Sequence, residues 1–379
     1  MTILSTDPRP RLDWLQALRG IAALAVVLTH TRRIFIGSPM SIEANDIFLP
    51  FASGVDLFFV ISGFIMVYTT YGQNGPQSAA AFARNRFLRI WPAYFAVSLI
   101  AMMIAGGFAF WLDGQMLRQF LLSIAFVPVN SEGIFSGQAL SVGWTLNYEV
   151  YFYLVFGLAL LAGRHRWTVM AAWFITTLIL IPLLFQAPSL WNPRANFGEV
   201  SYPFDYMLLA TNPIIWEFVG GMIAGIIFFS PLRMPSRMTA YALAVIAICL
   251  AVANAWFFYL YLSLAIGFGF VLLIAALAIA SKTVELAVPR WMRWLGDISY
   301  TLYIEHLIVI ELIRQVLAPP TSLAIGAAAF AVTVGTCVLI AGLTSPLLER
   351  RLPEVFKSAF PYLRAQAGRD RSRVAKSPS

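Results

Sequence analysis

The stretch RGIAALAVVLTH, Arg19 to His30, places a cation and a histidine at the two ends of an otherwise almost wholly apolar run. A helix rises about 1.5 Å per residue, so the two side chains would lie about 16 Å apart along the helix axis. A membrane-spanning helix needs about 20 apolar residues, and this segment supplies most of that length. A charged side chain inside a span costs about 2.5–3.5 kcal/mol or more, so both residues need a reason to be there.

The whole chain has the composition of a membrane protein. Of its 379 residues, 60% are hydrophobic and 12% are charged, whereas a soluble domain is about half apolar and roughly a quarter charged. The apolar runs predict an all-α, polytopic membrane protein with about ten transmembrane helices, because no other open structure satisfies its backbone in lipid. The predicted spans are residues 14–31, 51–71, 90–111, 143–163, 167–185, 212–229, 240–258, 262–280, 298–317 and 322–345.

The basic residues support this map and orient it. With the N-terminus in the cytoplasm, nearly every Lys and Arg falls on the cytoplasmic side, as the positive-inside rule requires. The outer exceptions are Arg32, Arg33, Arg118, Arg194 and Arg314. We therefore expect a multi-pass protein of the plasma (inner) membrane with both termini in the cytoplasm. The formal charge of +8 is read as a topology signal, and no nucleic-acid partner is predicted.

Four titratable residues from four different spans fall at one depth near the outer face: His30, Asp56, Glu149 and Glu217. A histidine beside a carboxylate can act as a general base, so His30 and Glu149 are the candidate catalytic residues. Asp56, Glu217 and Asn147, which lies beside Glu149, are candidates for supporting groups or acceptor contacts. Helix packing explains Asp56 and Glu217 equally well.

Arginines gather instead at the cytoplasmic mouth. Arg19 lies inside the first span, and Arg86 and Arg89 come just before the third. Arginine binds phosphate through paired hydrogen bonds, although rim arginines also serve topology and lipid anchoring. Phosphate binding at one face and proton chemistry near the other suggest acyl-CoA as the donor substrate, with no permanently bound cofactor. No metal site is predicted, because Cys249 and Cys337 lack metal-ligand spacing.

Five motifs in order resemble the integral-membrane acyltransferase-3 family, and specifically its exopolysaccharide-modifying branch. They are RGIAALAVVLTH, GVDLFFVISGFIM, RFLRIWPAY, GWTLNYEVYFY and GDISYTLYIEHL, and the resemblance covers nearly the whole chain. It implies transfer of an acyl group, usually acetyl from acetyl-CoA, to a hydroxyl of a saccharide or other acceptor at the extracytoplasmic side. In this resemblance His30 matches the family's essential histidine. The other matching residues are the donor arginines Arg19, Arg86 and Arg89, the fourth-span Glu149 and the late His306.

Two mechanisms are open at this point. In the first, His30 takes the proton from the acceptor hydroxyl while Glu149 orients the imidazole, and the oxygen attacks the thioester directly. In the second, a transient acyl-His30 forms and is then transferred. The expected partners are membrane lipid and a saccharide or glycosylated acceptor.

Other classes of protein also remain open. Buried His, Asp and Glu residues suit the proton relay of a secondary transporter, although the chain shows no inverted repeat. A polysaccharide-export component without chemistry of its own is another alternative. So is a different membrane O-acyltransferase class, whose usual Asn partner in a separate helix is not evident here.

The chain divides into two predicted parts. Residues 1–350 should form the membrane acyltransferase domain. Residues 351–379 should form a basic, disordered cytoplasmic tail, because they are charged and lack apolar periodicity. Two long outer loops, about 112–142 and 186–211, have the polar, aromatic and Gly/Pro mixture expected of a surface that meets a substrate.

Overall fold

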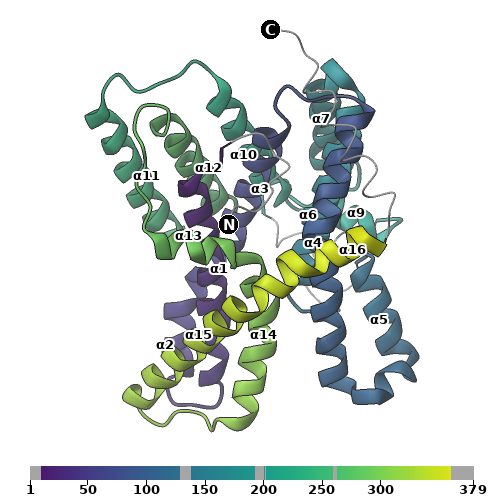
Figure 1. The fold of residues 1–379 in the computed structure, drawn as a ribbon, viewed down its shortest axis with the longest axis vertical. Helices are drawn as coiled ribbons and strands as arrows, with labels where there is room; N and C mark the ends of the chain where they lie inside the picture. Colours follow the sequence, from purple (N-terminus) through teal and green to yellow (C-terminus); the bar gives the residue numbers. More distant parts are fainter. Residues whose placement is uncertain (1–9, 129–137, 193–199, 201, 259–262, 360–379) are drawn as a thin grey trace.

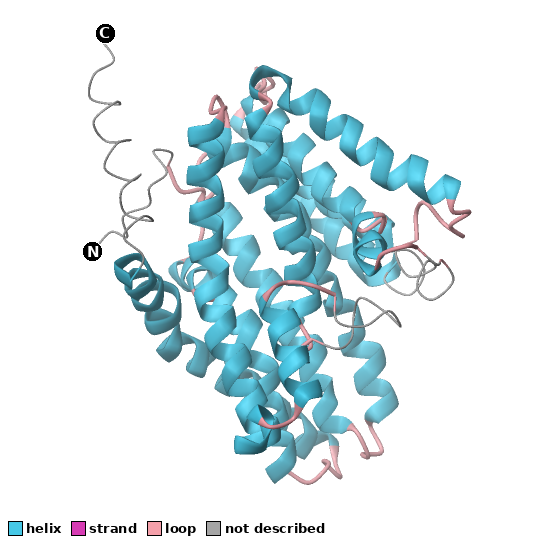
Figure 2. Ribbon diagram, turned by 90° about the vertical axis from the view of Figure 1, so that its right-hand side faces the viewer, coloured by secondary structure: helices cyan, strands magenta, loops and turns pink. Residues whose placement is uncertain are grey.

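The secondary structure of the described residues is entirely helical in the computed structural model (Figures 1 and 2). The structure describes residues 10–128, 138–192, 200, 202–258 and 263–359. The α-helices are α1 (Asp13–Thr31), α2 (Ser41–Phe48), α3 (Gly54–Thr70), α4 (Pro76–Gly106), α5 (Gly114–Ile124), α6 (Gly143–Leu161), α7 (Arg166–Ile175), α8 (Ile181–Leu184), α9 (Asp205–Ala210), α10 (Ile215–Phe229), α11 (Arg237–Phe258), α12 (Ser263–Ala280), α13 (Arg290–Asp297), α14 (Ser299–Val316), α15 (Leu323–Ser345) and α16 (Leu352–Ala359). Short 3-10 or π segments are η1 (Arg32–Phe35), η2 (Leu49–Ser53), η3 (Gly107–Trp111), η4 (Gly163–His165), η5 (Thr176–Leu180) and η6 (Pro346–Arg351).

Each predicted span coincides with a helix, namely α1, α3, α4, α6, the joined α7–η5–α8, α10, α11, α12, α14 and α15. Six helical stretches of the described residues are long and apolar enough to cross a membrane, and two shorter apolar helices lie in α10 and α12. Helices α1 and α14, which carry His30 and His306, are not in that set, since polar and charged residues interrupt both. The prediction of an all-α, polytopic membrane protein is confirmed.

Helix α4 differs from its predicted span at both ends. It begins at Pro76, where a proline at the first helical position loses no hydrogen bond. Its 31 residues extend about 46 Å, whereas the hydrocarbon core is about 30 Å thick. The polar first part, which includes Arg86, therefore continues the helix beyond the core. At the other end α4 stops at Gly106, and residues predicted to complete the span form η3 instead.

Helix α1 lies between α3, α13 and α14 and packs against all three. Close contacts at this centre need glycine. A Cβ on Gly20 would come 2.7 Å from the backbone nitrogen of Gly296, so α1 and α13 approach at backbone distance. Helices α3 and α10 show the same close approach, because a Cβ on Gly221 would overlap the carbonyl oxygen of Val60. Small residues at helix contacts allow this packing in membranes.

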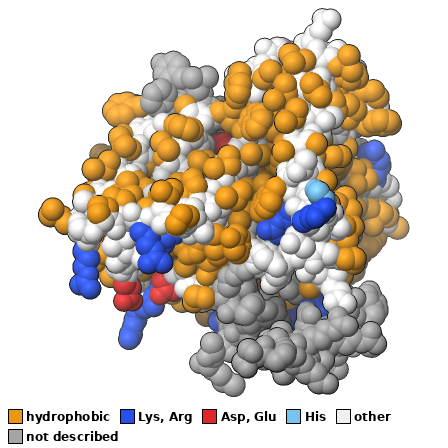
Figure 3. Space-filling model, turned by 90° about the horizontal axis from the view of Figure 1, so that it is seen from above, with side chains coloured by type: hydrophobic (Ala, Val, Ile, Leu, Met, Phe, Trp, Pro, Cys, Tyr) orange, Lys and Arg blue, Asp and Glu red, His pale blue; other side chains and the backbone are white. Residues whose placement is uncertain are grey.

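The remaining helices flank this centre on two sides. The α11–α12 pair packs beside α10 and α3, whereas α4, α6 and α7 lie on the opposite side, and α15 crosses the bundle obliquely against α14 and α1 (Figure 1). The view onto the end where α10 and α11 are joined shows broad hydrophobic areas with Lys and Arg side chains in a few places (Figure 3). This distribution fits a bundle surrounded by lipid with cations at its rim.

The predicted tail begins with ordered structure. The π segment η6 continues α15 through Arg351, and residues Leu352–Ala359 form α16. Phe356 of α16 contacts the ring of Trp91 in α4, with ring centroids 5.4 Å apart. The prediction of disorder from residue 351 is therefore wrong for this part, because an apolar face on a short polar helix was overlooked. Residues 360–379 lie outside the described residues, as do parts of the two predicted outer loops (129–137, 193–199 and 201).

Substitution Gly221→Ala should destabilise the bundle. Its new methyl group meets the backbone of α3, which cannot move away as a flexible side chain could. Overpacking of this kind costs about 1–3 kcal/mol, so the melting temperature in detergent should fall. Gly335→Ala is the matched control, because nothing lies within 4 Å of a Cβ at that position. Equal melting temperatures for the two variants would contradict the packing described here.

Candidate functional site

The two candidate histidines lie in contact. His30 is in the last turn of α1, and His306 is in α14 with its side chain 1% exposed. The Nδ1 atom of His30 lies 3.0 Å from the Nε2 atom of His306, and the ring centroids are 5.1 Å apart. Residues separated by 276 positions therefore form one pair.

The surroundings of His306 determine which nitrogen donates. Its Nδ1 lies 2.7 Å from the carbonyl oxygen of Tyr303 and 3.2 Å from that of Leu302. A carbonyl can only accept, so Nδ1 of His306 carries the proton, and Nε2 of the neutral ring accepts. Nδ1 of His30 then donates to His306, which leaves the lone pair of a neutral His30 on its own Nε2. An imidazole held in this tautomer has the form required of a general base or a nucleophile.

Glu149 does not orient His30, which corrects the expectation drawn from their common depth. Its carboxylate accepts from Ser62 Oγ at 2.8 and 2.7 Å and from the hydroxyl of Tyr153. His30 is oriented by His306 instead. Depth along a span is one coordinate only, and the side chain of Glu149 lies on the α6 face that lines a different space.

That space is a cavity of about 800 Å³. Its lining residues are Pro10, Arg11, Gln16, Arg19, Val55, Phe58, Phe59, Ile61, Ser62, Ile65, Tyr68, Thr69, Arg86, Arg89, Ile90, Thr145, Leu146, Glu149, Tyr153, Asp297, Tyr300, Tyr303 and Arg350. All three predicted donor arginines and Glu149 therefore share one cavity. Residues from α1, α3, α4, α6 and α14 contribute to it.

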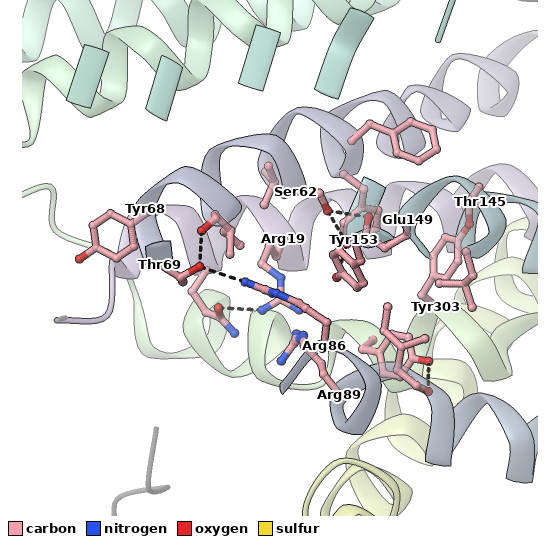
Figure 4. Close-up of a pocket in the computed structure, with 18 of the residues that line it drawn as sticks. Arg19, Ser62, Tyr68, Thr69, Arg86, Arg89, Thr145, Glu149, Tyr153 and Tyr303 are labelled. Carbon is pink, nitrogen blue, oxygen red and sulfur yellow. Dashed lines mark hydrogen bonds between the residues drawn. The ribbon is translucent and has the colours of Figure 1, made fainter. Parts of the chain in front are cut away.

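The arginines gather in the middle of the cavity, with Glu149, Ser62 and Tyr153 beyond them (Figure 4). Arg19 donates to Gln16 Oε1 at 3.1 Å, and Arg86 donates to Thr69 Oγ1 at 3.1 Å. Both partners are neutral, so neither bond neutralises a guanidinium. The cavity lining holds more arginines than carboxylates, which are Glu149 and Asp297, and such an excess of cations suits a polyanion.

Tyr303 connects the cavity to the histidine pair. Its ring lines the cavity, its hydroxyl bonds Thr145 Oγ1 at 2.7 Å, and its carbonyl accepts from His306. The ring of Phe58, another lining residue, packs edge-on against Tyr303 at 5.6 Å. Neither histidine lines the cavity, so this aromatic layer separates the cavity from the imidazoles.

Asp56 and Glu217 form a third group. Asp56 is 8% exposed and Glu217 is 2% exposed, and their carboxyl groups interact electrostatically. Glu217 also packs against Gly267 of α12, where a Cβ would come 2.7 Å from its Oε1. The four residues predicted at one depth are therefore divided among three places in the fold. Asn147 is buried without a hydrogen bond from either amide atom among the described residues.

Sequence reasoning missed several cavity residues that lie within the quoted motifs, namely Ser62, Thr145, Tyr153 and Tyr303. Their signal was present, since each is a polar residue or tyrosine in a motif already noted. Glu349 was also missed. It accepts from the Thr301 hydroxyl at 2.7 Å and from the Thr301 N–H at 3.1 Å, and it interacts electrostatically with Arg19. A carboxylate just after the last apolar run resembled an ordinary loop residue.

The motifs come together as a family site would. The sequence model of the family described as "Acyltransferase domain" matches residues 12–342. The chain belongs to this acyltransferase family. The predicted family is thereby confirmed, and the chain is a membrane O-acyltransferase. This membership favours the acyltransferase over the secondary transporter and over an export component without chemistry.

Curated relatives agree with this assignment. The chain is 32% identical to "Exopolysaccharide production protein ExoZ" of Rhizobium meliloti, over 79% of this chain and 90% of that protein. It is 26% identical to "Nodulation protein 10" of Rhizobium leguminosarum, over 78% of this chain and 82% of the relative. It is also 30% identical to "Putative membrane-bound transacylase BcsY" of Komagataeibacter xylinus, over 46% of this chain and 45% of the relative. No solved structure matches the chain significantly.

Removal of the His306 ring should lower turnover without weakening donor binding. His306→Ala removes the side-chain acceptor of His30 Nδ1, so the imidazole is held less firmly in its tautomer and orientation. We expect kcat for CoA release to fall by about 10–100-fold, by analogy with the cost of losing the outer hydrogen-bond partner of a metal-bound histidine. The KM for the acyl donor should stay unchanged, because His306 does not line the cavity.

Two further variants test whether orientation is the cause. His306→Gln should recover part of the activity, because its amide oxygen can accept from His30. His165→Ala, in the exposed segment η4, should keep full activity. Undiminished turnover by His306→Ala would refute the role given to the pair.

Proposed function

We propose that the protein transfers an acyl group, most simply acetyl, from cytoplasmic acyl-CoA to a hydroxyl of a saccharide acceptor on the extracytoplasmic side of the plasma membrane. The observation that carries the proposal is that an arginine-lined cavity lies next to the His30–His306 pair. The cavity holds Arg19, Arg86 and Arg89, and its far end adjoins the residues that bind His306. Such an arrangement suits a donor with phosphates at one end and a reactive thioester at the other.

The donor assignment rests on charge and length. Three guanidinium groups line the cavity, and the hydrogen-bond partners of Arg19 and Arg86 are neutral, so all three can supply the paired donors that phosphate groups accept. Arg19 and His30 are separated by about 16 Å along α1, which is comparable to an extended pantetheine arm. The phosphates would bind near the arginines, and the thioester would reach the aromatic layer of Phe58 and Tyr303.

In the proposed reaction, Nε2 of His30 takes the proton from the acceptor hydroxyl. The oxygen attacks the thioester carbonyl, the carbon–sulfur bond breaks, and the imidazolium returns its proton to the departing CoA thiolate. His306 supports this cycle, because its Nε2 accepts from the His30 N–H and stabilises the imidazolium that forms. The rival route acylates His30 Nε2 first and transfers the acyl group in a second step. An acyl group trapped on His30 without acceptor would overturn direct attack.

Glu149 has a different role in this proposal. Its carboxylate is held by Ser62 and Tyr153 within the arginine cavity. It offsets part of the positive charge before the donor binds, and it holds the Tyr153 hydroxyl at the cavity wall. Glu149 thus acts on the donor side of the site.

The proposed acceptor is inferred from the relatives, and the proposed orientation in the membrane is inferred from the distribution of Lys and Arg. A relative named for exopolysaccharide production supports a saccharide hydroxyl as the acceptor. The clustering of Lys and Arg in loops on one side supports cytoplasmic termini. His30, at the other end of α1, would then meet an acceptor outside the cytoplasm.

The first test is consumption of acetyl-CoA by the purified protein in nanodiscs, with an oligosaccharide extract from the host as acceptor. Wild type should release CoA when the extract is present. His30→Ala should bind the donor but release less than about one hundredth as much CoA, the contribution typical of a general base. Failure of the wild type both to bind and to consume acyl-CoA would refute the donor assignment.

Arg89→Gln should raise the KM for acyl-CoA by about 10-fold or more. A hydrogen bond to a charged group contributes about 1.5–3 kcal/mol, and the loss should act on binding more than on kcat. The matched control is Arg84→Gln, because Arg84 lies on the same helix but does not line the cavity. An equal rise of the KM in both variants would mean that the effect comes from the overall positive charge at this end of the bundle and that Arg89 has no specific role.

A further inference from the structure

Arg33 lies one helical turn beyond His30, in the segment η1 that follows α1 directly. Residues three apart on a helix share a face. The half-buried guanidinium of Arg33 is close enough to His30 and His306 to interact electrostatically with both rings. A fixed positive charge therefore lies beside the histidine pair, at the end of α1 opposite to the arginine cavity.

The neighbouring cations on this side have partners within the protein. Arg32 donates to the Asn45 side chain at 3.1 Å and to Thr29. Arg314 forms an ion pair with Glu311 at 2.7 Å, and a second bond of 3.1 Å makes the contact bidentate. The side chains of Arg32 and Arg314 therefore already have hydrogen-bond or ion-pair partners within the protein.

Arg33 is different. Among the residues that the structure describes, its side chain makes no hydrogen bond and no ion pair, although its backbone carbonyl accepts from Ile36. Glu311 is near enough to attract it, but both carboxylate oxygens of Glu311 are bound by Arg314. A half-buried guanidinium without a partner is costly, and a cation on the outer side also departs from the positive-inside pattern. An external anion would satisfy both its charge and its donors.

We propose that Arg33 binds an anionic group of the acceptor, a carboxylate or a phosphate, and thereby brings the neighbouring hydroxyl to Nε2 of His30. This inference rests on the proposed function, because it deepens the acceptor side of that site. The anion has two possible sources. It is either the carboxylate of an acidic sugar within the glycan or the phosphate of a lipid carrier to which a neutral glycan is attached. Arginine recognises both through paired N–H donors.

The test is direct binding, measured without acyl-CoA, to purified protein in nanodiscs of zwitterionic lipid. The probes are a neutral oligosaccharide, an oligosaccharide of equal length that contains one uronic acid, and the neutral oligosaccharide linked to a short polyprenyl diphosphate. Wild type should bind one of the two anionic probes at least about 10-fold more tightly than the neutral one, which corresponds to about 1.4 kcal/mol. The probe that shows the preference identifies the source of the anion.

Arg33→Gln should abolish this preference while leaving the affinity for the neutral probe unchanged, and Arg33→Lys should restore part of it. Arg118→Gln is the matched control, since it removes another cation predicted on the outer side, on α5 away from the histidine pair, and it should keep the preference. Equal affinities of wild type for all probes, or a preference that survives Arg33→Gln, would overturn the inference. A loss of stability in Arg33→Gln that appears only with anionic lipid, without any change in probe binding, would also overturn it and identify a headgroup anchor.

The two proposals fail in different ways. Arg33-dependent binding of an anionic probe by a protein that never consumes acetyl-CoA would refute the proposed acyl transfer and leave the anion site established. Acyl transfer with equal efficiency to neutral and anionic acceptors, in wild type and in Arg33→Gln, would support the proposed function and refute the role of Arg33.

Discussion

The hydrogen bond between His30 and His306 joins the end of α1 to α14, and the proposed chemistry depends on the tautomer that it fixes. Within lipid a polar side chain has no water to bind, so its partner must come from another helix. The backbone carbonyl of Tyr303 accepts from Nδ1 of His306, so that nitrogen carries the proton. Nε2 of His306 then accepts from His30, so the proton of His30 is on its Nδ1. One carbonyl in α14 thereby determines which nitrogen of His30 has a free lone pair.

The same requirement organises the arginine cavity. Arg19, Arg86 and Arg89 come from α1 and α4, and other residues that line the cavity with them come from α3, α6, α13, α14 and η6. Glu149 belongs to this group because Ser62 and Tyr153 hold its carboxylate there. Tyr303 connects the cavity to the histidine pair, because it lines the cavity and its carbonyl oxygen accepts from His306. A donor that passes this residue could have its phosphates and its reacting carbon in two different environments.

Close helix packing makes these encounters possible. Glycines at the α1–α13 and α3–α10 contacts allow backbones to approach where any larger residue would separate the helices. Helix α4 contributes in another way, because its polar N-terminal extension carries Arg86 along a continuous helix beyond the apolar run. Hydropathy predicted the position of each span well, since apolar length is a local property of the chain. It missed this extension and also α16, because both are helices that lie outside a long apolar run.

The sequence by itself determined the all-α membrane fold, the order of the helices, the family and the residues that stand out in lipid. Periodicity and hydropathy are local, and five ordered motifs identify a family without coordinates. Only the tertiary structure decided which of these residues meet. Depth along a span predicted His30 beside Glu149, whereas the fold pairs His30 with His306, Glu149 with Ser62, and Asp56 with Glu217. The reason is physical: depth is one coordinate, and the rotation and neighbours of each helix are set by packing between segments distant in the chain.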